Sequence, residues 1–281
     1  MQWGNLRQSG NVEDQRGGRG GLVAGGGIGT LIIAAVIYFL GGDPNQVLQQ
    51  APPQRSGQTQ QANRANAPAD QPKRFVSAVL ADTEDVWRAI FKQQGKTYVE
   101  PKIVLFTDQV RSACGITGAS SGPFYCPADQ KLYIDFSFYD ELKNRYHAPG
   151  DFAQAYVIAH EVGHHVQNLI GTMDKVDAMR SRAGKAESNA LSVRLELQAD
   201  FLAGVWAHYA QKRGLLDAGD LDEALTAASA IGDDRLQGES QGYVVPDSFT
   251  HGTSAQRLRW FKRGFDSGDL SQGDTFSPKN L

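Results

Sequence analysis

Hydrophobic residues recur at helical spacing through most of the second half of the chain. Residues 151–171 have apolar side chains on every turn, begin with an aspartate and end with a glycine, which are typical first and last residues of a helix. A second long helix is predicted from about residue 187 to residue 213, where Gly214 ends it. Shorter helices are predicted at about 220–231 and 254–265.

The preceding segment predicts one helix followed by short strands. Apolar residues recur at helical spacing over residues 75–91, and Gly95 follows as a stop. Residues 138–144 are predicted to form a short helix. Three segments are strand-like: 102–106, 124–126 and 131–138. The last two flank a PADQ turn, which is typical of a hairpin. A small sheet followed by helices predicts an α+β domain.

The N-terminal part of the chain has a different pattern. Residues 21–40 contain no charged residue, and twenty residues of helix cover about 30 Å, the thickness of the hydrocarbon core of a bilayer. A transmembrane helix is therefore predicted here; a cleaved signal peptide is the alternative, although its apolar core would be shorter. Residues 41–72 are rich in Gln, Pro, Ala and Asn and are predicted to be a flexible linker, followed by one compact domain over residues 73–281.

Basic residues near the predicted span indicate its orientation. Arg7, Arg16 and Arg19 precede the span, whereas the first basic residue after it is Arg55. The positive-inside rule then places residues 1–20 in the cytoplasm as a short N-terminal segment and the domain outside the cytoplasm, in the periplasm if the cell is Gram-negative. The lipid bilayer would be a partner of the protein through the predicted span.

The composition sets limits on the class of protein. The 281 residues are 41% hydrophobic and 21% charged and carry a formal net charge of −3, which disfavours a wholly disordered chain and a multi-span membrane protein. A nearly neutral chain gives no electrostatic reason to expect nucleic acid as a partner. Two cysteines are too few for a disulfide-dense scaffold or a four-cysteine zinc site. The sequence leaves the oligomeric state open.

The two cysteines, Cys114 and Cys126, bracket a loop rich in Gly and Ser. In the oxidising compartment that the predicted topology implies, a disulfide closing this loop would contribute about 3 kcal/mol in the chain-entropy treatment. The sequence therefore favours a bridge between Cys114 and Cys126, with two buried free thiols as the alternative.

Residues 160–164 read HEVGH, which matches H-E-x-x-H within a predicted helix that is largely apolar. Because residues four apart share a helix face, the imidazoles of His160 and His164 can bind one metal ion, for which zinc is the usual choice. Glu161 is rotated by about 100° from His160 and would lie beside the ion as a general base. His165, one position past the pair, is expected to face away from the ion.

A catalytic zinc has three protein ligands and an open position, so a third ligand is expected on another element. Glu196 is the candidate, because Asp200 lies four residues later on the same helix face and would brace a ligating histidine. Both acids lie in a mostly apolar segment, which distinguishes them from acids on a solvated helix face. The competing ligands are Glu187, His208 and His251.

His251 lies in a loop that enters the last predicted helix, which Ser254 would cap. Two roles remain open for His251. It would either donate a hydrogen bond to an oxyanion that develops during hydrolysis or brace the loop through bonds to the backbone. Arg257 is expected to be structural and to pair with an acid.

Longer blocks of sequence carry a resemblance to a known family. The blocks HEVGHH, LSVRLELQADFLAGVW, AIGDDRLQ and VVPDSFTHGTSAQR, with GPFYCPAD and LYIDFSFYDEL before them, resemble the putative neutral zinc metallopeptidases of bacteria. The resemblance extends to the N-terminal span and covers nearly the whole chain. It implies a membrane-anchored, gluzincin-like peptidase with a zincin-like fold, in which His160, His164 and Glu196 bind zinc, Glu161 is the base and Asp200 braces a histidine.

The sequence thus predicts a zinc endopeptidase that acts on a peptide or protein substrate and binds one Zn²⁺ per chain. Residues 131–138 are expected to form the rim of the cleft, where a substrate chain would add as a further strand. A non-catalytic scaffold that keeps zinc for stability is the alternative, although structural zinc sites normally have four protein ligands. A hydrolase of non-peptide amides of the cell envelope is a further alternative.

Overall fold

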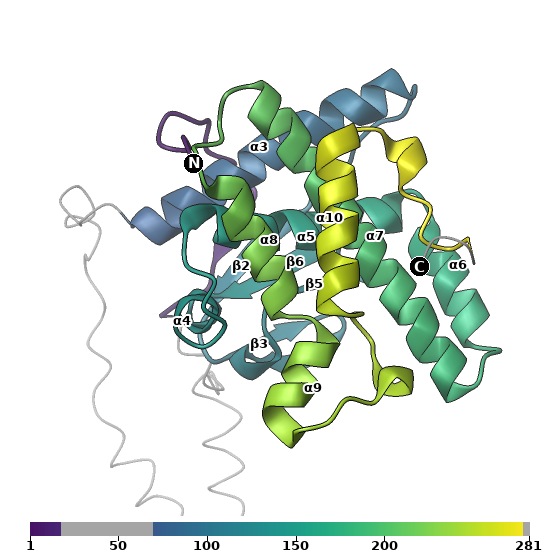
Figure 1. Ribbon diagram of the computed structural model, residues 1–281. Coiled ribbons are helices and arrows are strands. Elements are labelled where there is room, and N and C mark those ends of the chain that lie inside the picture. The colour runs from purple at the N-terminus through teal and green to yellow at the C-terminus, as the bar shows by residue number, and fades with distance from the viewer. Residues whose placement is uncertain (18–69, 278–281) are drawn as a thin grey trace, which may run out of the picture. The chain divides into compact units, whose positions relative to one another are not determined.

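The computed structural model describes residues 1–17 and 70–277. Over these residues the chain has a mixed α/β fold with eight α-helices, a four-stranded sheet and a two-stranded sheet (Figure 1). Residues 1–16 and the chain from residue 71 onward belong to one compact unit. The N-terminal residues are therefore part of the same folded body as the long helices.

The four-stranded sheet has the order β1-β2-β6-β5. Strands β1, β2 and β6 run parallel to one another, whereas β5 pairs antiparallel with β6 in the predicted hairpin and is an outer strand of the described sheet. The bounds are β1 Val12–Asp14, β2 Lys102–Phe106, β5 Phe124–Cys126 and β6 Lys131–Asp135, with β3 Gln109–Ser112 and β4 Gly115–Gly118 in the smaller sheet.

Side chains alternate between the two faces of the larger sheet, as the period of a strand requires. Ile103 and Leu105 of β2 join the main hydrophobic core with the helices. Val104 and Phe106 of the same strand pack on the opposite face in a smaller cluster, which includes Cys126. Both faces are buried, which explains why β2 reads as a continuous apolar run.

The helices predicted from periodicity at 75–91, 138–144, 151–171, 187–213, 220–231 and 254–265 are confirmed, with small shifts at their ends. Two further helices, α6 and α9, follow the long helix α5 and the helix α8 in the chain. The bounds are α3 Gln71–Gln93, α4 Ser137–Asn144, α5 Asp151–Leu169, α6 Thr172–Arg180, α7 Lys185–Lys212, α8 Asp220–Ala230, α9 Asp233–Gln241 and α10 Ser254–Ser267.

The elements that the sequence pattern does not predict are short or polar. Helices α6 and α9 have nine residues each and bury one side chain each, Val176 and Asp233, so their apolar periodicity is weak. The strand expected over 131–138 ends earlier. The Asp135 carboxylate accepts the Ser137 N–H at 2.9 Å, and helix α4 begins there.

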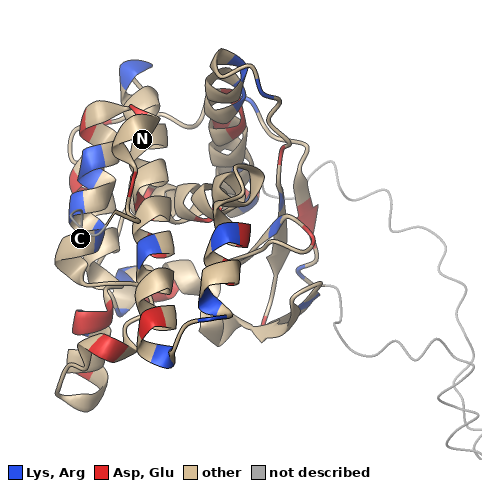
Figure 2. Cartoon of the chain, turned by 90° about the vertical axis from the view of Figure 1, so that its right-hand side faces the viewer, with Lys and Arg blue, Asp and Glu red and all other residues tan. Residues whose placement is uncertain are grey.

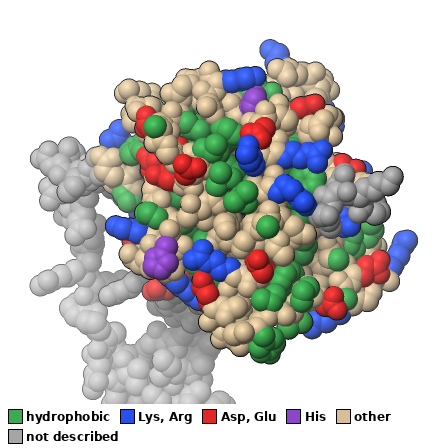
Figure 3. Space-filling view, in the orientation of Figure 1, with side chains coloured by type: hydrophobic (Ala, Val, Ile, Leu, Met, Phe, Trp, Pro, Cys, Tyr) green, Lys and Arg blue, Asp and Glu red, His purple; other side chains and the backbone are tan. Residues whose placement is uncertain are grey.

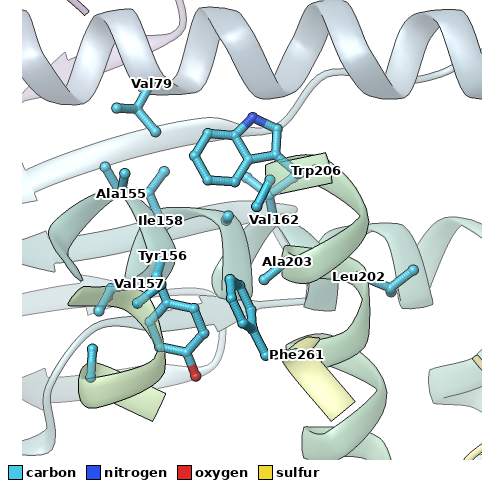
Figure 4. Packing of buried hydrophobic residues seen from close by; sticks show 14 of the residues in the cluster. Val79, Ala155, Tyr156, Val157, Ile158, Val162, Leu202, Ala203, Trp206 and Phe261 are labelled. Carbon is cyan, nitrogen blue, oxygen red and sulfur yellow. The ribbon is translucent and has the colours of Figure 1, made fainter. Parts of the chain in front are cut away.

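The main core lies between α3, α5, α7 and α10 (Figure 4). Trp206 of α7 stacks on Phe152 of α5 with ring centroids 5.6 Å apart, and its Nε1 donates to Asp82 of α3 at 2.8 Å. Tyr156 of α5 meets Phe261 of α10 edge to face at 5.3 Å. Helix α5, which carries the HEVGH motif, is thus fixed by aromatic packing on two sides.

Helices α7 and α10 cross at two glycines. A Cβ atom on Gly204 would lie 2.0 Å from the carbonyl oxygen of Phe261, and a Cβ atom on Gly264 would lie 2.0 Å from that of Phe201. Any other residue at these positions would push the helices apart. The close crossing sets α10 directly against the helix that carries Glu196.

The predicted single-pass topology is wrong. It places one membrane crossing between residues 1–20 and the domain, whereas residues 1–16 pack within the same compact unit as the chain from residue 71 onward. Strand β1 pairs with β2, and the Met1 ammonium group contacts the carboxylates of Asp151 at 2.8 Å and Asp220 at 3.2 Å. No helix in the described ranges is long and apolar enough to span a bilayer.

Of the three basic residues that oriented the predicted span, Arg7 and Arg16 have partners within the folded unit, and Arg19 lies outside the described residues. Arg7 contacts the carboxylate of Glu84 at 2.8 Å, and Arg16 contacts that of Asp14 at 2.7 Å. The side chain of Glu84 is 1% exposed, so Arg7 compensates a buried charge. Arg7 and Arg16 therefore form ion pairs in the fold. The predicted span 21–40 and most of the predicted linker lie outside the described residues.

Charged residues are distributed over the helices (Figure 2), and basic, acidic and hydrophobic side chains are intermingled on the face shown in Figure 3. This distribution matches the near balance of 28 Lys and Arg with 31 Asp and Glu. Hydrophobic side chains also reach the surface directly after α9, where Tyr243 is 62% exposed and Val244 is 45% exposed.

Candidate metal centre

Helices α5 and α7 approach each other closely at the HEVGH motif. A Cβ atom on Gly163 would lie 2.9 Å from the carbonyl oxygen of Ala199, so glycine at this position lets the two backbones come together. The approach brings Glu196 and Asp200 of α7 to the face of α5 that carries the first histidine of the motif, His160.

Three side chains from these helices converge on one point. The Nε2 atom of His160 lies 3.1 Å from Oε2 of Glu196, and the Nε2 atom of His164 lies 3.4 Å from Oε1 of the same carboxylate. One ligand atom from each of the three residues lies within 4.8 Å of the others. The two imidazoles are buried, and the Glu196 side chain is 18% exposed. The predicted ligand set is therefore brought together.

The remaining nitrogen of each imidazole has an acceptor. His160 Nδ1 lies 2.9 Å from Asp200 Oδ1, and His164 Nδ1 lies 2.9 Å from Gln167 Oε1. The amide nitrogen of Gln167 donates to the carbonyl oxygen of Leu195 at 2.7 Å, which turns its oxygen towards His164. Both Nδ1 atoms thus hold a proton, and both Nε2 atoms are directed to the point of convergence.

Gln167 was missed by the sequence reasoning, although a signal exists. It lies seven residues after His160 and three after His164, on the same face of α5. The helical spacing that linked the two histidines would also have included Gln167.

The carboxylates around the two imidazoles favour positive charge at this site. Burial by itself lowers the pKa of His160, but Asp200 and Glu196 outweigh burial and raise it to about 10. Burial opposes a raised pKa at His164 in the same way, and Glu196 overcomes it. Burial would raise the pKa of Glu196, but the two histidines, His164 foremost, hold it well below its ordinary value. The site suits a cation.

Asp200 is the centre of a buried network, as its predicted bracing role requires. Its carboxylate accepts the Tyr156 hydroxyl at 2.6 Å and the Arg257 guanidinium through Nε at 2.9 Å and Nη2 at 3.0 Å. The Asp200 side chain is fully buried, and that of Arg257 is 2% exposed. Arg257 therefore pairs with an acid, and that acid is the one that contacts His160.

The three converging residues form part of the wall of a cavity of about 470 Å³. Glu161 lies in the same wall, and burial raises the pKa of its carboxyl group, although both histidines of the motif oppose this shift. The lining is otherwise largely apolar or aromatic and includes Phe124, Tyr125, Phe138, Tyr146, Val157, Met173, Leu195, Ile231 and Leu236.

His251 combines features of both roles that the sequence left open. Its backbone N–H donates to the Asp233 carboxylate at 2.6 Å, and its Nδ1 lies 3.2 Å from the same side chain, so it braces the loop. Its side chain is 50% exposed and also lines the cavity. The hydrogen bond to Asp233 raises the pKa of His251 against the effect of burial. Thr253, rather than Ser254, caps the helix that follows.

Two of the three competing ligands, Glu187 and His208, lie outside the cavity wall, whereas the third, His251, lines the cavity. The Nδ1 atom of His208 lies 2.7 Å from the carbonyl oxygen of Phe265, and Glu187 is exposed in the first turn of α7. His165 is turned away from the cluster, and its Nε2 lies 2.7 Å from the carbonyl oxygen of Val99. His208, Glu187 and His165 are therefore not part of the cavity wall.

Cys114 and Cys126 are joined by a disulfide. The loop that the bond closes contains β4 and the segment Ser121–Tyr125, which forms one side of the cavity. The covalent link therefore restricts this part of the cavity wall.

The model of the putative neutral zinc metallopeptidase family matches residues 1–276. The chain belongs to this family. Among its relatives, the uncharacterized protein YpfJ of Escherichia coli is 52% identical, over 98% of this chain and 99% of the relative. An uncharacterized protein of Mycobacterium tuberculosis is 39% identical, over 86% of both chains. No solved structure matches this metallopeptidase family member.

Proposed function

We propose that this protein is a zinc-dependent peptidase. The observation that carries the proposal is the convergence of two imidazole nitrogens and the Glu196 carboxylate in a cavity wall that also contains Glu161. Both imidazoles are oriented by acceptors on their other nitrogens, as is usual for histidines that bind zinc. Membership of a family described as zinc metallopeptidases supports the same function.

The donor set fits a catalytic rather than a structural zinc ion. Two imidazoles and one carboxylate are a common set of three protein ligands at catalytic zinc, whereas structural zinc normally has four protein ligands. In the described residues, His160, His164 and Glu196 form the candidate group that contains histidine. We therefore expect one zinc ion per chain with a position open to the cavity.

The arrangement of elements supports a zincin-like fold. The helix with the H-E-x-x-H motif packs against a second helix that supplies the third ligand and against a sheet whose outer strand, β5, is antiparallel to its neighbour. The sequence placed the cleft rim at residues 131–138, but β6 lies between β2 and β5. We assign the rim to β5, where a peptide would add as a further strand.

In the proposed reaction, Glu161 transfers the protons. Its carboxylate takes a proton from the attacking water and then gives a proton to the nitrogen of the leaving amine. The raised pKa of this buried group brings it closer to neutral pH and suits both steps. The His251 ring, held by Asp233, donates a hydrogen bond to the developing oxyanion. A bound zinc ion supplies Lewis-acid polarisation of the scissile carbonyl and the water.

We expect the purified protein to cleave peptides next to large apolar residues. The side chains of Met173, Leu195 and Leu236 give part of the cavity an apolar lining that would bury such a residue. Digestion of an unbiased peptide library, followed by mass spectrometry, measures the preference. Cleavage should stop in the presence of a chelator and return when zinc is restored. A protein that binds zinc but cleaves no peptide would instead support the scaffold alternative.

Replacing Glu196 with alanine is expected to remove most of the bound zinc. The substitution deletes the carboxylate that lies within 3.4 Å of both imidazole Nε2 atoms. Glu187→Ala is the matched control, because Glu187 lies on the same helix but is exposed. Zinc per chain is measured by elemental mass spectrometry after dialysis. Unchanged zinc affinity in Glu196→Ala would show that the third ligand is misassigned.

A further inference from the structure

Helix α5 has a second polar face in addition to the one that carries the cluster. His165 is rotated by about 100° from His164, and Asn168 lies three residues after His165 on the same side of the helix. The His165 side chain is fully buried. Both residues reach the same group, the hydroxyl of Tyr125 on strand β5.

The directions of these hydrogen bonds follow from the partners. His165 Nε2 lies 2.7 Å from the carbonyl oxygen of Val99, which accepts only, so Nε2 carries the proton. His165 Nδ1 is then an acceptor, and the Tyr125 hydroxyl donates to it at 3.0 Å. Asn168 Nδ2 donates to the same hydroxyl at 3.0 Å. One tyrosine oxygen is thus held by two side chains of α5.

Tyr125 is the central residue of β5 and also lines the cavity. Strand β5 has only three residues and pairs with β6 along one side. The disulfide at Cys126, the stacking of Phe124 on Tyr133 with ring centroids 4.8 Å apart, and the hydroxyl of Tyr125 also hold the strand. The Tyr125 hydroxyl connects the strand by hydrogen bonds to the helix of the HEVGH motif.

We propose that His165 is a positioning residue for the peptide substrate, which it serves by fixing β5 to α5 through the Tyr125 hydroxyl. The proposal rests on the proposed peptidase function, in which the free side of β5 pairs with the substrate chain. A strand held at a constant distance from His160 and His164 presents its backbone groups to the peptide without further ordering. A strand released from α5 would have to be ordered each time a peptide binds.

The substitution Tyr125→Phe tests the link while keeping the aromatic ring. We expect KM for a cleaved peptide to rise about tenfold, because the hydroxyl that bonds both His165 and Asn168 is lost, with kcat within about twofold of the parent and zinc content unchanged. Tyr133→Phe is the matched control, because Tyr133 lies on the neighbouring strand and its hydroxyl donates to Asp129 at 2.7 Å, away from the cavity. It should leave KM unchanged.

His165→Leu removes the acceptor and fills the buried space with an apolar side chain. It should raise KM as Tyr125→Phe does, and combining the two substitutions should add little, because both remove the same hydrogen bond. Additive effects on KM, or a fall in kcat with unchanged KM, would overturn the assignment of His165 as a positioning residue.

Amide hydrogen exchange provides a readout that does not need turnover. Exchange at residues 124–126 should be faster in Tyr125→Phe than in the zinc-loaded parent, while exchange in α5 stays the same. Unchanged exchange at β5 would refute the link even in an active enzyme. A parent protein that cleaves no peptide would instead refute the peptidase function, whatever the exchange at β5.

Discussion

Replacing Glu161 with glutamine is expected to lower the rate of peptide hydrolysis by about 10²–10⁴-fold. Glutamine has nearly the same volume as glutamate and forms hydrogen bonds, but it does not take a proton from water. The substitution removes no member of the converging group of His160, His164 and Glu196. Zinc content and stability should therefore stay close to those of the parent.

Initial rates with a fluorogenic peptide and zinc per chain should be measured on the same samples. Glu187→Gln is a suitable control, since it changes an exposed glutamate outside the cavity wall in the same way. Full peptide hydrolysis by a fully zinc-loaded Glu161→Gln protein would end the mechanism proposed here. Loss of zinc in this variant would assign Glu161 to metal binding instead.

The sequence predicted the helices well because their signal is local. Residues 151–171 and 187–213 have continuous apolar periodicity and glycine stops, and α5 and α7 occupy these positions. The same periodicity placed His160 and His164 on one face and identified Asp200 four residues after Glu196. The contact between these groups also depends on Gly163, which lets α5 approach Ala199 of α7. This role of Gly163 is apparent only in the structure.

The misassigned parts depend on contacts between distant residues. Strand β1 has three residues and pairs with β2 about ninety positions later. It is too short for an apolar pattern, and its partner strand is too far along the chain for the pairing to be predicted. Arg7 pairs with Glu84, which is distant in sequence. From the local charge pattern alone, the same arginine would indicate the orientation of a membrane span. The hydrogen bond between Tyr125 and His165 likewise joins a strand and a helix, and local periodicity does not predict which elements pack together.

Asp200 illustrates how far a sequence argument reaches. The spacing of four residues from Glu196 predicted a carboxylate behind a histidine, and His160 lies 2.9 Å from it. The sequence also predicted that Arg257 pairs with an acid, but it did not predict that the acid would be Asp200. The face of α5 that carries His160 and the helix α10 are thus connected through one buried carboxylate.

Replacing Arg257 with methionine is expected to lower the free energy of unfolding by about 3–5 kcal/mol, because it leaves the buried Asp200 carboxylate without its guanidinium partner. Urea unfolding at a fixed zinc concentration measures the loss. Arg259→Met, at an exposed position on the same helix, should change stability by less than about 0.5 kcal/mol.

The double variant Arg257→Met with Asp200→Asn should recover part of that stability, because the uncompensated charge is gone. It should still bind zinc about 10–100-fold more weakly than the parent, since asparagine is a poorer acceptor for the proton on His160 Nδ1.

The pH dependence of stability provides a further check on the pair. Burial alone would raise the pKa of Asp200, but Arg257 and His160 hold it below its ordinary value. The stability gained from this shift is therefore fully present above about pH 3.9, the pKa of an aspartate in the unfolded chain, and is lost as the pH falls through the folded pKa. In Arg257→Met the pKa of Asp200 should rise, so the acid transition should begin at higher pH. An acid transition identical to that of the parent would show that Arg257 does not stabilise the Asp200 carboxylate.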